Sequence, residues 1–262
     1  MSPLATWALT TAVVAVSAAV QALTGFGFAV VAVPFLVVLN DPRDAVALST
    51  LLSTVGVATM WWRTRGQAPA RMMRWLAVGG LAGLPAGILV LLRLDVSWLK
   101  LGAGLLSLGL GVVLLSVGVE RPVLRASGTG SGADEPRPPG ALVAGLLSGF
   151  LAGSLSMPGP PLMVLLHQEQ VLKQAYRATS FAYFVLIYPV AALAMVATGV
   201  VSSAVLVSSI THLPAMLLGT AVGDAGHDML SQRHFTIAAL LLLCAGGVAG
   251  AMAGISALVG RL

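Results

Sequence analysis

Two short clusters of turn-forming residues interrupt the apolar sequence at corresponding places in the two halves of the chain. They are Gly25-Phe26-Gly27 and Pro158-Gly159-Pro160-Pro161. If a new helix begins near Phe28, its first backbone N–H groups lack an intrahelical partner and carry partial positive charge, which suits an anion. We expect the same chemistry at the second break, because prolines fit the first helical turn without losing a hydrogen bond. Interrupted segments at equivalent positions of two halves indicate a binding site of the kind found in secondary transporters.

Small polar side chains near both breaks can donate hydrogen bonds to the oxygens of an anion. The predicted substrate-binding set combines these side chains, the break residues and one arginine: Gln21, Thr24, Gly25, Gly27, Phe28, Ser49, Thr50, Pro158, Gly159, Pro160, Arg177, Thr179 and Ser180. Two alternatives remain open at this stage. The hydroxyls can instead bond to their own helix backbone, and the glycines can instead allow close helix packing.

Ionisable side chains are scarce within the apolar segments. No Asp, Glu, Lys or Arg lies clearly in the middle of one, which argues against a carboxylate-based cation pump or a long proton relay. His212 is the exception, and it either couples transport to protons or hydrogen-bonds a neighbouring helix. Arg177 and Arg43 are candidates for attracting anions, although Asp41 and Asp44 flank Arg43 and favour an anchoring role for it.

The composition indicates a polytopic membrane protein. Hydrophobic residues make up 58% of the 262 positions and charged residues 9%, against about 45–50% and about 25% in soluble domains. The excess of Lys and Arg is typical of cytoplasmic loops, so no nucleic-acid partner is expected. Cys244 is the single cysteine and lies in the last apolar run, which excludes an intrachain disulfide and a cysteine-based metal site.

The motifs of common enzyme classes are missing from the sequence. It contains no P-loop, no catalytic carboxylate pair, no Ser-His-Asp arrangement and no HExxH motif. We therefore expect neither an enzyme nor a nucleotide-driven motor, and we predict no catalytic residue, metal ligand or cofactor. No Lys or Arg precedes Arg43, so the first apolar run is expected to be retained rather than cleaved.

The elements that must position these residues are helices. Eight apolar blocks lie at about 4–39, 45–62, 75–92, 98–119, 140–166, 178–198, 200–222 and 235–259. The first spans 36 residues, well beyond the roughly 20 that cross a bilayer. A polar stretch rich in Gly, Ser and Pro, residues 120–139, reads as a linker between a first membrane repeat, 1–119, and a second, 140–262.

Short segments recur in the same order in the two halves. Ala47-Leu48-Ser49 corresponds to Ala178-Thr179-Ser180, 131 residues later, and Leu84-Pro85-Ala86 recurs as Leu213-Pro214-Ala215, 129 residues later. The nearly constant offset indicates an internal duplication.

Loop charges distinguish two possible topologies. If all eight blocks cross the membrane straight, eight of the fourteen Lys and Arg residues lie on one side and six on the other, which sets no orientation. If blocks one and five each turn back at their break, ten lie on one side and four on the other: Arg43, Arg93, Lys100 and Arg261. The ten-residue side is then cytoplasmic, both termini lie outside, and the halves are inverted repeats. The predicted fold is thus an all-α membrane protein of about eight transmembrane segments in two inverted four-segment repeats, with segments 1 and 5 broken or re-entrant.

The chain resembles the sulfite exporter (TauE/SafE-type) family of membrane permeases over essentially its whole length. The matching segments are Gly25-Phe26-Gly27 through Pro34-Phe35-Leu36, Ala45 through Leu52, Gly145, Gly149 and Gly153, Met157-Pro158-Gly159-Pro160-Pro161-Leu162, and Arg177-Ala178-Thr179-Ser180. The resemblance implies secondary transport of small anions, often sulfur oxyanions or organic sulfonates, across the bacterial inner membrane.

The resulting hypothesis is a permease that moves a small oxyanion by alternating access around a site at the two breaks. Its expected partners are a small anionic substrate and the lipid bilayer, and the sequence leaves a homo-oligomer open. A passive anion channel is the first alternative, disfavoured by the few polar residues within the apolar blocks. A non-transporting membrane scaffold is the second, disfavoured because the longest loop has only about 20 residues.

Overall fold

The structure, a computed structural model, describes residues 2–24, 27–64, 70–117, 138–168, 173–226 and 232–260. Within these ranges all regular structure is α-helical, as the composition predicted. The ten helices are α1 (Pro3–Thr24), α2 (Phe28–Leu39), α3 (Pro42–Thr64), α4 (Ala70–Arg93), α5 (Val96–Val117), α6 (Pro138–Leu155), α7 (Gly159–Gln168), α8 (Lys173–Ala197), α9 (Ser203–Gly226) and α10 (Gln232–Val259).

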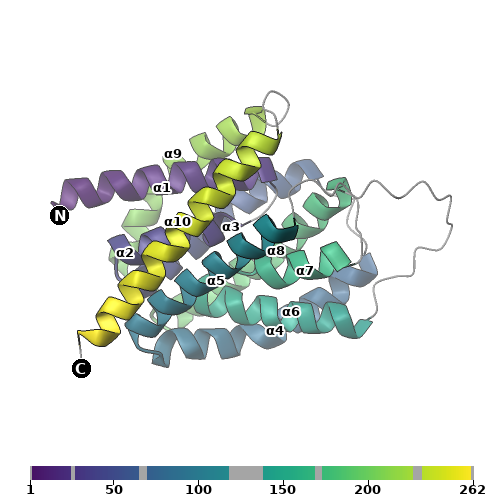
Figure 1. Cartoon of the computed structure of the whole chain (residues 1–262). Coiled ribbons are helices and arrows are strands. Elements are labelled where there is room, and N and C mark those ends of the chain that lie inside the picture. The colour runs from purple at the N-terminus through teal and green to yellow at the C-terminus, as the bar shows by residue number, and fades with distance from the viewer. Residues whose placement is uncertain are drawn as a thin grey trace.

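The two apolar blocks that contain the breaks each fold as a pair of helices, α1–α2 and α6–α7. Asn40, which follows α2, donates from Nδ2 to Thr10 Oγ1 in the first half of α1, at 3.4 Å. At the other pair, a β-carbon placed on Gly140 near the start of α6 lies 3.7 Å from Leu165 Cδ1 near the end of α7. The second helix of each pair therefore runs back alongside the first (Figure 1).

Six helices of the described part are long and apolar enough to cross a membrane, by length and composition. The six spans are Pro3–Leu23, Pro42–Trp62, Arg71–Arg93, Tyr176–Ala197, Ser203–Ala225 and Leu240–Val259. Three shorter apolar helices accompany them, at Phe28–Leu39, Val96–Val112 and Pro139–Leu155. The chain is thus a multi-pass membrane protein.

Glycines allow several helix pairs to pack backbone against backbone. A β-carbon on Gly149 of α6 meets the carbonyl oxygen of Gly80 in α4, and one on Gly153 lies 2.6 Å from the carbonyl oxygen of Leu84. Glycines of α9 lie equally close to carbonyls of α1, and α5 packs on α10 in the same way. Gly149 and Gly153, which the family resemblance includes, therefore serve helix packing.

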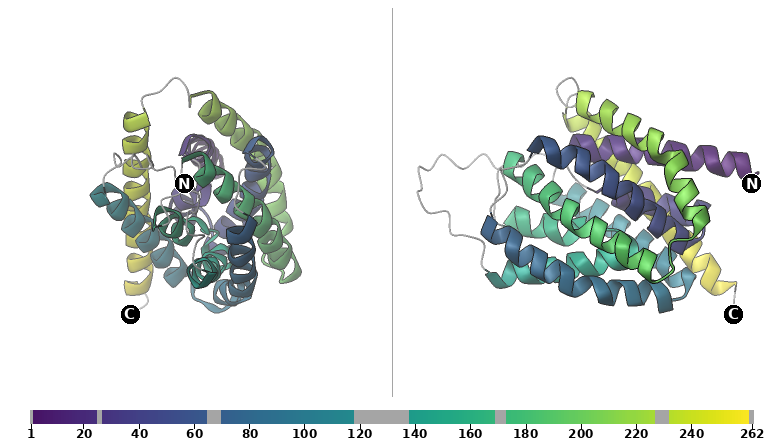
Figure 2. Two further views of the ribbon diagram at one scale, coloured as in Figure 1. Left: turned by 90° about the vertical axis from the view of Figure 1, so that its right-hand side faces the viewer. Right: turned by 180° about the vertical axis from the view of Figure 1, so that it is seen from behind.

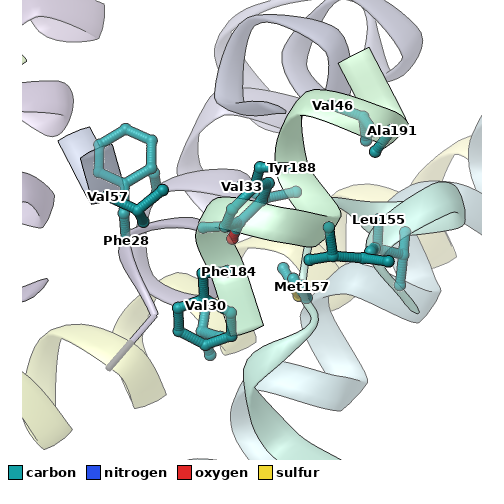
Figure 3. Packing of buried hydrophobic residues seen from close by; sticks show 14 of the residues in the cluster. Phe28, Val30, Val33, Val46, Val57, Leu155, Met157, Phe184, Tyr188 and Ala191 are labelled. Atoms are coloured by element: carbon teal, nitrogen blue, oxygen red, sulfur yellow. The ribbon is translucent and has the colours of Figure 1, made fainter. Parts of the chain in front are cut away.

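The helices α3 and α8 pack against each other at the centre of the bundle. Figure 3 shows the side chains that fill this region, among them Phe28 and Val33 of α2, Phe184 and Tyr188 of α8, and Met157. Each is at most 2% exposed. The space between the two breaks is therefore closed by apolar packing in this conformation.

Both ends of the described chain lie at one end of the bundle (Figures 1 and 2). The turns between α2 and α3, α4 and α5, and α8 and α9 lie at that same end. The last residues of α3, α5, α7 and α9 lie at the opposite end. This arrangement places the two helix pairs in opposite senses, since α1 and α6 start from opposite ends.

Candidate functional site

One face of α3 extends from the second break to the end of α1. Ser49, Ser53 and Gly56 are spaced four and three residues apart, so they share that face. At one end of it, the hydroxyl of Ser156 donates to Ser49 Oγ at 3.3 Å. At the other end, a β-carbon on Gly56 lies 3.6 Å from the amide oxygen of Gln21, one turn before α1 ends.

A face of α8 connects the same two regions from the opposite side. Arg177 donates from Nη2 to the carbonyl oxygen of Ala22 near the end of α1, at 3.1 Å. Eleven residues along, the phenol of Tyr188 donates to the carbonyl oxygen of Ser156, also at 3.1 Å. Between them lie Phe181, whose ring centroid is 6.0 Å from the Arg177 guanidinium carbon, and Phe184, 5.8 Å from the Tyr188 ring.

The second break is built around a left-handed residue. Ser156 follows the last residue of α6 with φ of 59°, a conformation that glycine adopts more readily than serine. The next N–H, of Met157, donates to the carbonyl oxygen of Leu151 at 3.0 Å. The hydroxyl of Ser148 donates to the carbonyl oxygen of Pro158. The turn is thereby fixed by hydrogen bonds within the α6–α7 pair.

Four side chains at this turn form what we call the hydroxyl cluster: Ser49, Ser53, Ser156 and Tyr188. Each is at most 1% exposed. The Ser53 hydroxyl lies near the Tyr188 phenol without reaching hydrogen-bond geometry. Hydroxyl groups both donate and accept hydrogen bonds, and they carry no charge. The cluster is therefore a set of uncharged hydroxyls buried beside a break in the backbone, two of which, Ser156 and Tyr188, donate within the protein.

The first break presents backbone donors instead. Gly27 precedes α2 with φ of 55° and accepts a hydrogen bond from the N–H of Val30 at 3.1 Å, and no side chain caps this end. The Ser107 hydroxyl of α5 donates to the Val30 carbonyl oxygen at 2.9 Å and fixes α2 in place. The Phe28 side chain is fully buried, so Phe28 can offer a ligand only its backbone N–H.

The expectation that both breaks offer the same backbone chemistry needs correction. Helix α7 begins at Gly159, so Pro160 and Pro161 occupy its second and third positions. Proline carries no N–H, and two of the first amide donors are therefore missing. The second break therefore offers fewer backbone donors than the first, and the hydroxyl cluster lies beside it.

The other predicted residues divide into four groups. Gln21 and Thr179 are at most 2% exposed, and Gln21 Nε2 and Thr179 Oγ1 are buried without a hydrogen-bond partner in the described part of the chain. Thr50 donates to the carbonyl oxygen of Val46 at 2.9 Å, which is the backbone-bonded alternative. Ser180 is buried as well. Gly25 and the side chain of Thr24 lie outside the described residues.

His212 lies apart from these faces, in the outer helix α9. Its Nδ1 lies 2.7 Å from the carbonyl oxygen of Ser208, and its ring centroid is 5.7 Å from that of Trp7 in α1. An open groove of about 510 Å³ lies beside it, lined by Trp7, Ser203, Ala204, Val207, Ser208 and Thr211. Proton coupling through His212 stays a prediction.

Arg43 stabilises the end of α4. Its Nε donates to the carbonyl oxygen of Leu91 at 3.1 Å, and Nη2 donates to those of Leu92 and Leu94 at 3.1 and 3.2 Å. Cations are favourable at this position because the last helical carbonyls carry partial negative charge. Arg43 therefore has a structural role at the end of α4, and the interfacial anchoring that the flanking aspartates favoured stays a prediction.

Sequence reasoning missed three members of the hydroxyl cluster: Ser53, Ser156 and Tyr188. Ser53 had a detectable signal, since it lies one helical turn after Ser49. Ser156 also had one, as a polar residue directly before the second break. Tyr188 had none, because its position beside Ser156 depends on how α8 packs against α6 and α3.

The comparison with protein families gives one match. A sequence model described as sulfite exporter TauE/SafE matches residues 9–258, which run from α1 to the last turn of α10. No curated protein matches the chain, and no solved structure matches it. The matched span includes both breaks and both faces described above.

Proposed function

The chain belongs to the sulfite exporter TauE/SafE family, and from this we propose that it is a secondary transporter that carries small oxyanions by alternating access. Family membership implies a membrane exporter of sulfite or related anions. We place the substrate between α3 and α8, where the first break, the hydroxyl cluster and Arg177 surround one path. The proposed location is the bacterial inner membrane.

Helix lengths support a site near the middle of the membrane. Helix α2 has 12 residues and α7 has 10, so they extend about 18 and about 15 Å. They start from the two breaks and end at opposite ends of the bundle. In a hydrocarbon core about 30 Å thick, both breaks then lie near the midplane, where transporters of inverted repeats bind their substrates.

The pattern of helix contacts supports the proposed inverted repeat. An inverted repeat would match each helix of the first half to the one five places later, so that α1 matches α6, α3 matches α8 and α4 matches α9. The contact of α4 with α6 then corresponds to the contact of α9 with α1. The contact of α3 with α9 corresponds to the contact of α8 with α4. Both pairs of contacts occur. We therefore retain 1–119 and 140–262 as the repeats, joined by the linker 120–139.

Charge supports an orientation. In the proposed topology ten of the fourteen Lys and Arg residues, Arg71, Arg74 and Arg177 among them, belong to the end of the bundle where α3 and α5 finish, and four belong to the other end. The positive-inside rule makes the more basic end cytoplasmic. Arg177 then faces an anion that arrives from the cytoplasm. An anion competes with the Ala22 carbonyl oxygen for the guanidinium, which offers a way to loosen the contact between α8 and α1.

Buried aromatic rings support a carrier rather than an open channel. Phe181 and Phe184 are at most 2% exposed and lie between Arg177 and Tyr188 along α8. In this conformation they separate the cytoplasmic end from the hydroxyl cluster. Transport then requires α8 to move relative to α3, so that the cluster opens to one side at a time.

One observation carries the proposal: a single face of α3 runs from Ser49, bonded to Ser156 beside the second break, to Gly56, which lies close to Gln21 one turn before α1 ends. The test is exchange of labelled for unlabelled sulfite or methanesulfonate across liposomes that contain the protein. We expect saturable exchange, reduced by Ser49→Ala. Thr59→Val is the matched control, because Thr59 is exposed on the same helix and donates to the carbonyl oxygen of Gly56 in that helix. If no sulfur or carboxylate oxyanion is exchanged, the proposal fails.

A further inference from the structure

We infer that Pro189 is a hinge at which the first half of α8 bends away from α3. The bending segment runs from Arg177 to Tyr188, and we call it the gate arm. This inference rests on the proposed transport function and adds the residue about which one gate turns. It also makes the two repeats unequal, because α3, the helix that matches α8 in the first half, has no such hinge.

A proline lies in the interior of α8, which runs from Lys173 to Ala197. Proline has no N–H, so Pro189 gives no helical hydrogen bond to the carbonyl oxygen of Val185, four residues earlier. Bending at this point therefore does not have to break one. In a membrane a broken backbone hydrogen bond is costly, since no water replaces it. Pro189 thus marks the place where α8 bends most easily.

The internal duplication shows that this proline belongs to one half alone. At the offset of 131 residues between the two halves, Pro189 corresponds to Ala58 of α3. Helix α3 has no proline beyond its first residue, Pro42. By contrast, Pro85 of α4 and Pro214 of α9 occupy equivalent positions in the two halves. Of the two central helices, only α8 can bend in this way.

The gate arm lies on a smooth surface of α4. On its side facing α4, the Tyr183 ring and the side chain of Ile187 lie against Gly80, with Ile187 Cδ1 3.2 Å from the position of a β-carbon on that glycine. The Tyr183 phenol donates to the Gly145 carbonyl oxygen of α6 at 3.4 Å, which is long for a hydroxyl donor. A side chain at residue 80 would obstruct the arm, and glycine leaves it room to slide.

The other end of α8 is held by a closed turn. Gly199 has φ of 74°, and the N–H of Val200 donates to the carbonyl oxygen of Met195 at 2.9 Å. A glycine in this conformation satisfies the last carbonyls of a helix, and the turn leads directly into α9. A bend at Pro189 therefore displaces the gate arm rather than the end of the helix.

The length of the arm makes a small bend sufficient. Arg177 lies twelve residues before Pro189, about 18 Å along the helix axis. A bend of about 20°, ordinary for a proline in a helix, moves the Arg177 end by about 6 Å. The hydrogen bond from Arg177 to the Ala22 carbonyl oxygen is 3.1 Å long, so this movement breaks it. The same movement carries Phe181 away from α3 and opens the end that the proposed orientation makes cytoplasmic.

The experiment replaces the proline by the residue that α3 has at the matched position. Pro189→Ala supplies an N–H for the Val185 carbonyl oxygen, so bending must then break a hydrogen bond. In the purified protein, hydrogen–deuterium exchange of the amides from Arg177 to Tyr188 should slow about tenfold. In liposomes, kcat for the exchange of methanesulfonate should fall by about the same factor. KM should stay that of the wild type, because the substitution alters a movement and no group of the proposed site.

Two further variants separate bending from packing. Pro189→Gly also supplies the N–H and keeps the backbone flexible, so its kcat should lie between those of the wild type and Pro189→Ala. Pro214→Ala makes the same chemical change at an exposed proline of α9. It should leave both the amide exchange of the gate arm and the kcat unchanged.

The outcomes separate the hinge from the transport function. Unchanged amide exchange of the gate arm in Pro189→Ala overturns the hinge, and so does a raised KM. Equal losses of kcat in Pro189→Gly and Pro189→Ala also overturn it, because they show that the proline ring acts through packing. If the wild-type protein carries no anion saturably, the transport function fails, and the amide exchange still decides whether α8 bends at Pro189.

Discussion

At the scale of single residues, Ser156 holds an unusual position. Its left-handed backbone closes the turn at the second break, its carbonyl accepts from Tyr188, and its hydroxyl donates to Ser49. Glycine would satisfy the backbone with less strain, by about 1 kcal/mol. A serine here indicates that the hydroxyl matters more than the strain, which is a common reason for strained backbone at functional sites.

Two substitutions at Ser156 separate these contributions. Ser156→Gly and Ser156→Ala both remove the hydroxyl, and only Ser156→Ala keeps a side chain in the left-handed conformation. We expect Ser156→Gly to be the more stable variant by about 1 kcal/mol, measured as the thermal midpoint in detergent. Both variants should lose the same fraction of transport affinity. Equal stability of the two variants would contradict the assigned backbone conformation.

The two arginines near the starts of the central helices α3 and α8 should respond differently to substitution. Arg43→Gln removes hydrogen bonds to three carbonyls at the end of α4 and should lower the free energy of unfolding by about 1–3 kcal/mol. Its KM for transport should stay that of the wild type. Arg177→Gln should instead raise KM, because it removes the cation at the proposed entrance. A raised KM in Arg43→Gln would argue against its structural role.

At the scale of helices, the two breaks could be predicted and the packing between helices could not. Glycine and proline set local backbone geometry, so Gly27 and the Pro158–Pro161 run mark the ends of α1 and α6 within a few residues. The faces of α3 and α8 depend on contacts between distant parts of the chain. For that reason Tyr188 was missed. The loss of two amide donors at the start of α7 follows from Pro160 and Pro161 themselves.

The glycine contact between α4 and α6 gives a sharp test of helix packing. Gly149→Ala places a methyl group against the carbonyl oxygen of Gly80, and neither backbone can yield without moving its helix. We expect a loss of about 1–3 kcal/mol in stability. Gly109→Ala in α5 is the matched control, since nothing lies within 4 Å of its β-carbon position. It should be neutral or stabilising by up to about 1 kcal/mol, and a comparable loss in both variants would contradict the contact.

At the scale of the whole molecule, the sequence established the class of protein and the structure added the arrangement of its parts. Composition and apolar runs sufficed for a multi-pass helical protein, because a membrane imposes that pattern on any chain that crosses it. Loop charges favoured segments that turn back, and the contacts of Asn40 with Thr10 and of Gly140 with Leu165 show α2 and α7 doing so.

The proposed orientation predicts where a reporter will function. Alkaline phosphatase, which is active only outside the cytoplasm, should be active when fused after Leu262. Inserted within the linker 120–139, it should be inactive, because ten of the fourteen Lys and Arg residues belong to that side in the proposed topology. An inactive fusion after Leu262 would reverse the orientation and place Arg177 at the outer face.

The glycine-packed pairs also set a constraint on how the protein is made. Helix α1 packs on α9, and α4 packs on α6. These two early helices can therefore bury their packing faces only after the partner helix from the second half has been synthesised. Until synthesis passes α6 and then α9, the nascent first half exposes faces that are shaped for close contact, such as Gly83 and Gly87 of α4. A chain that stops at the linker would lack α6 and α9, so we expect it to leave these faces of α1 and α4 uncovered.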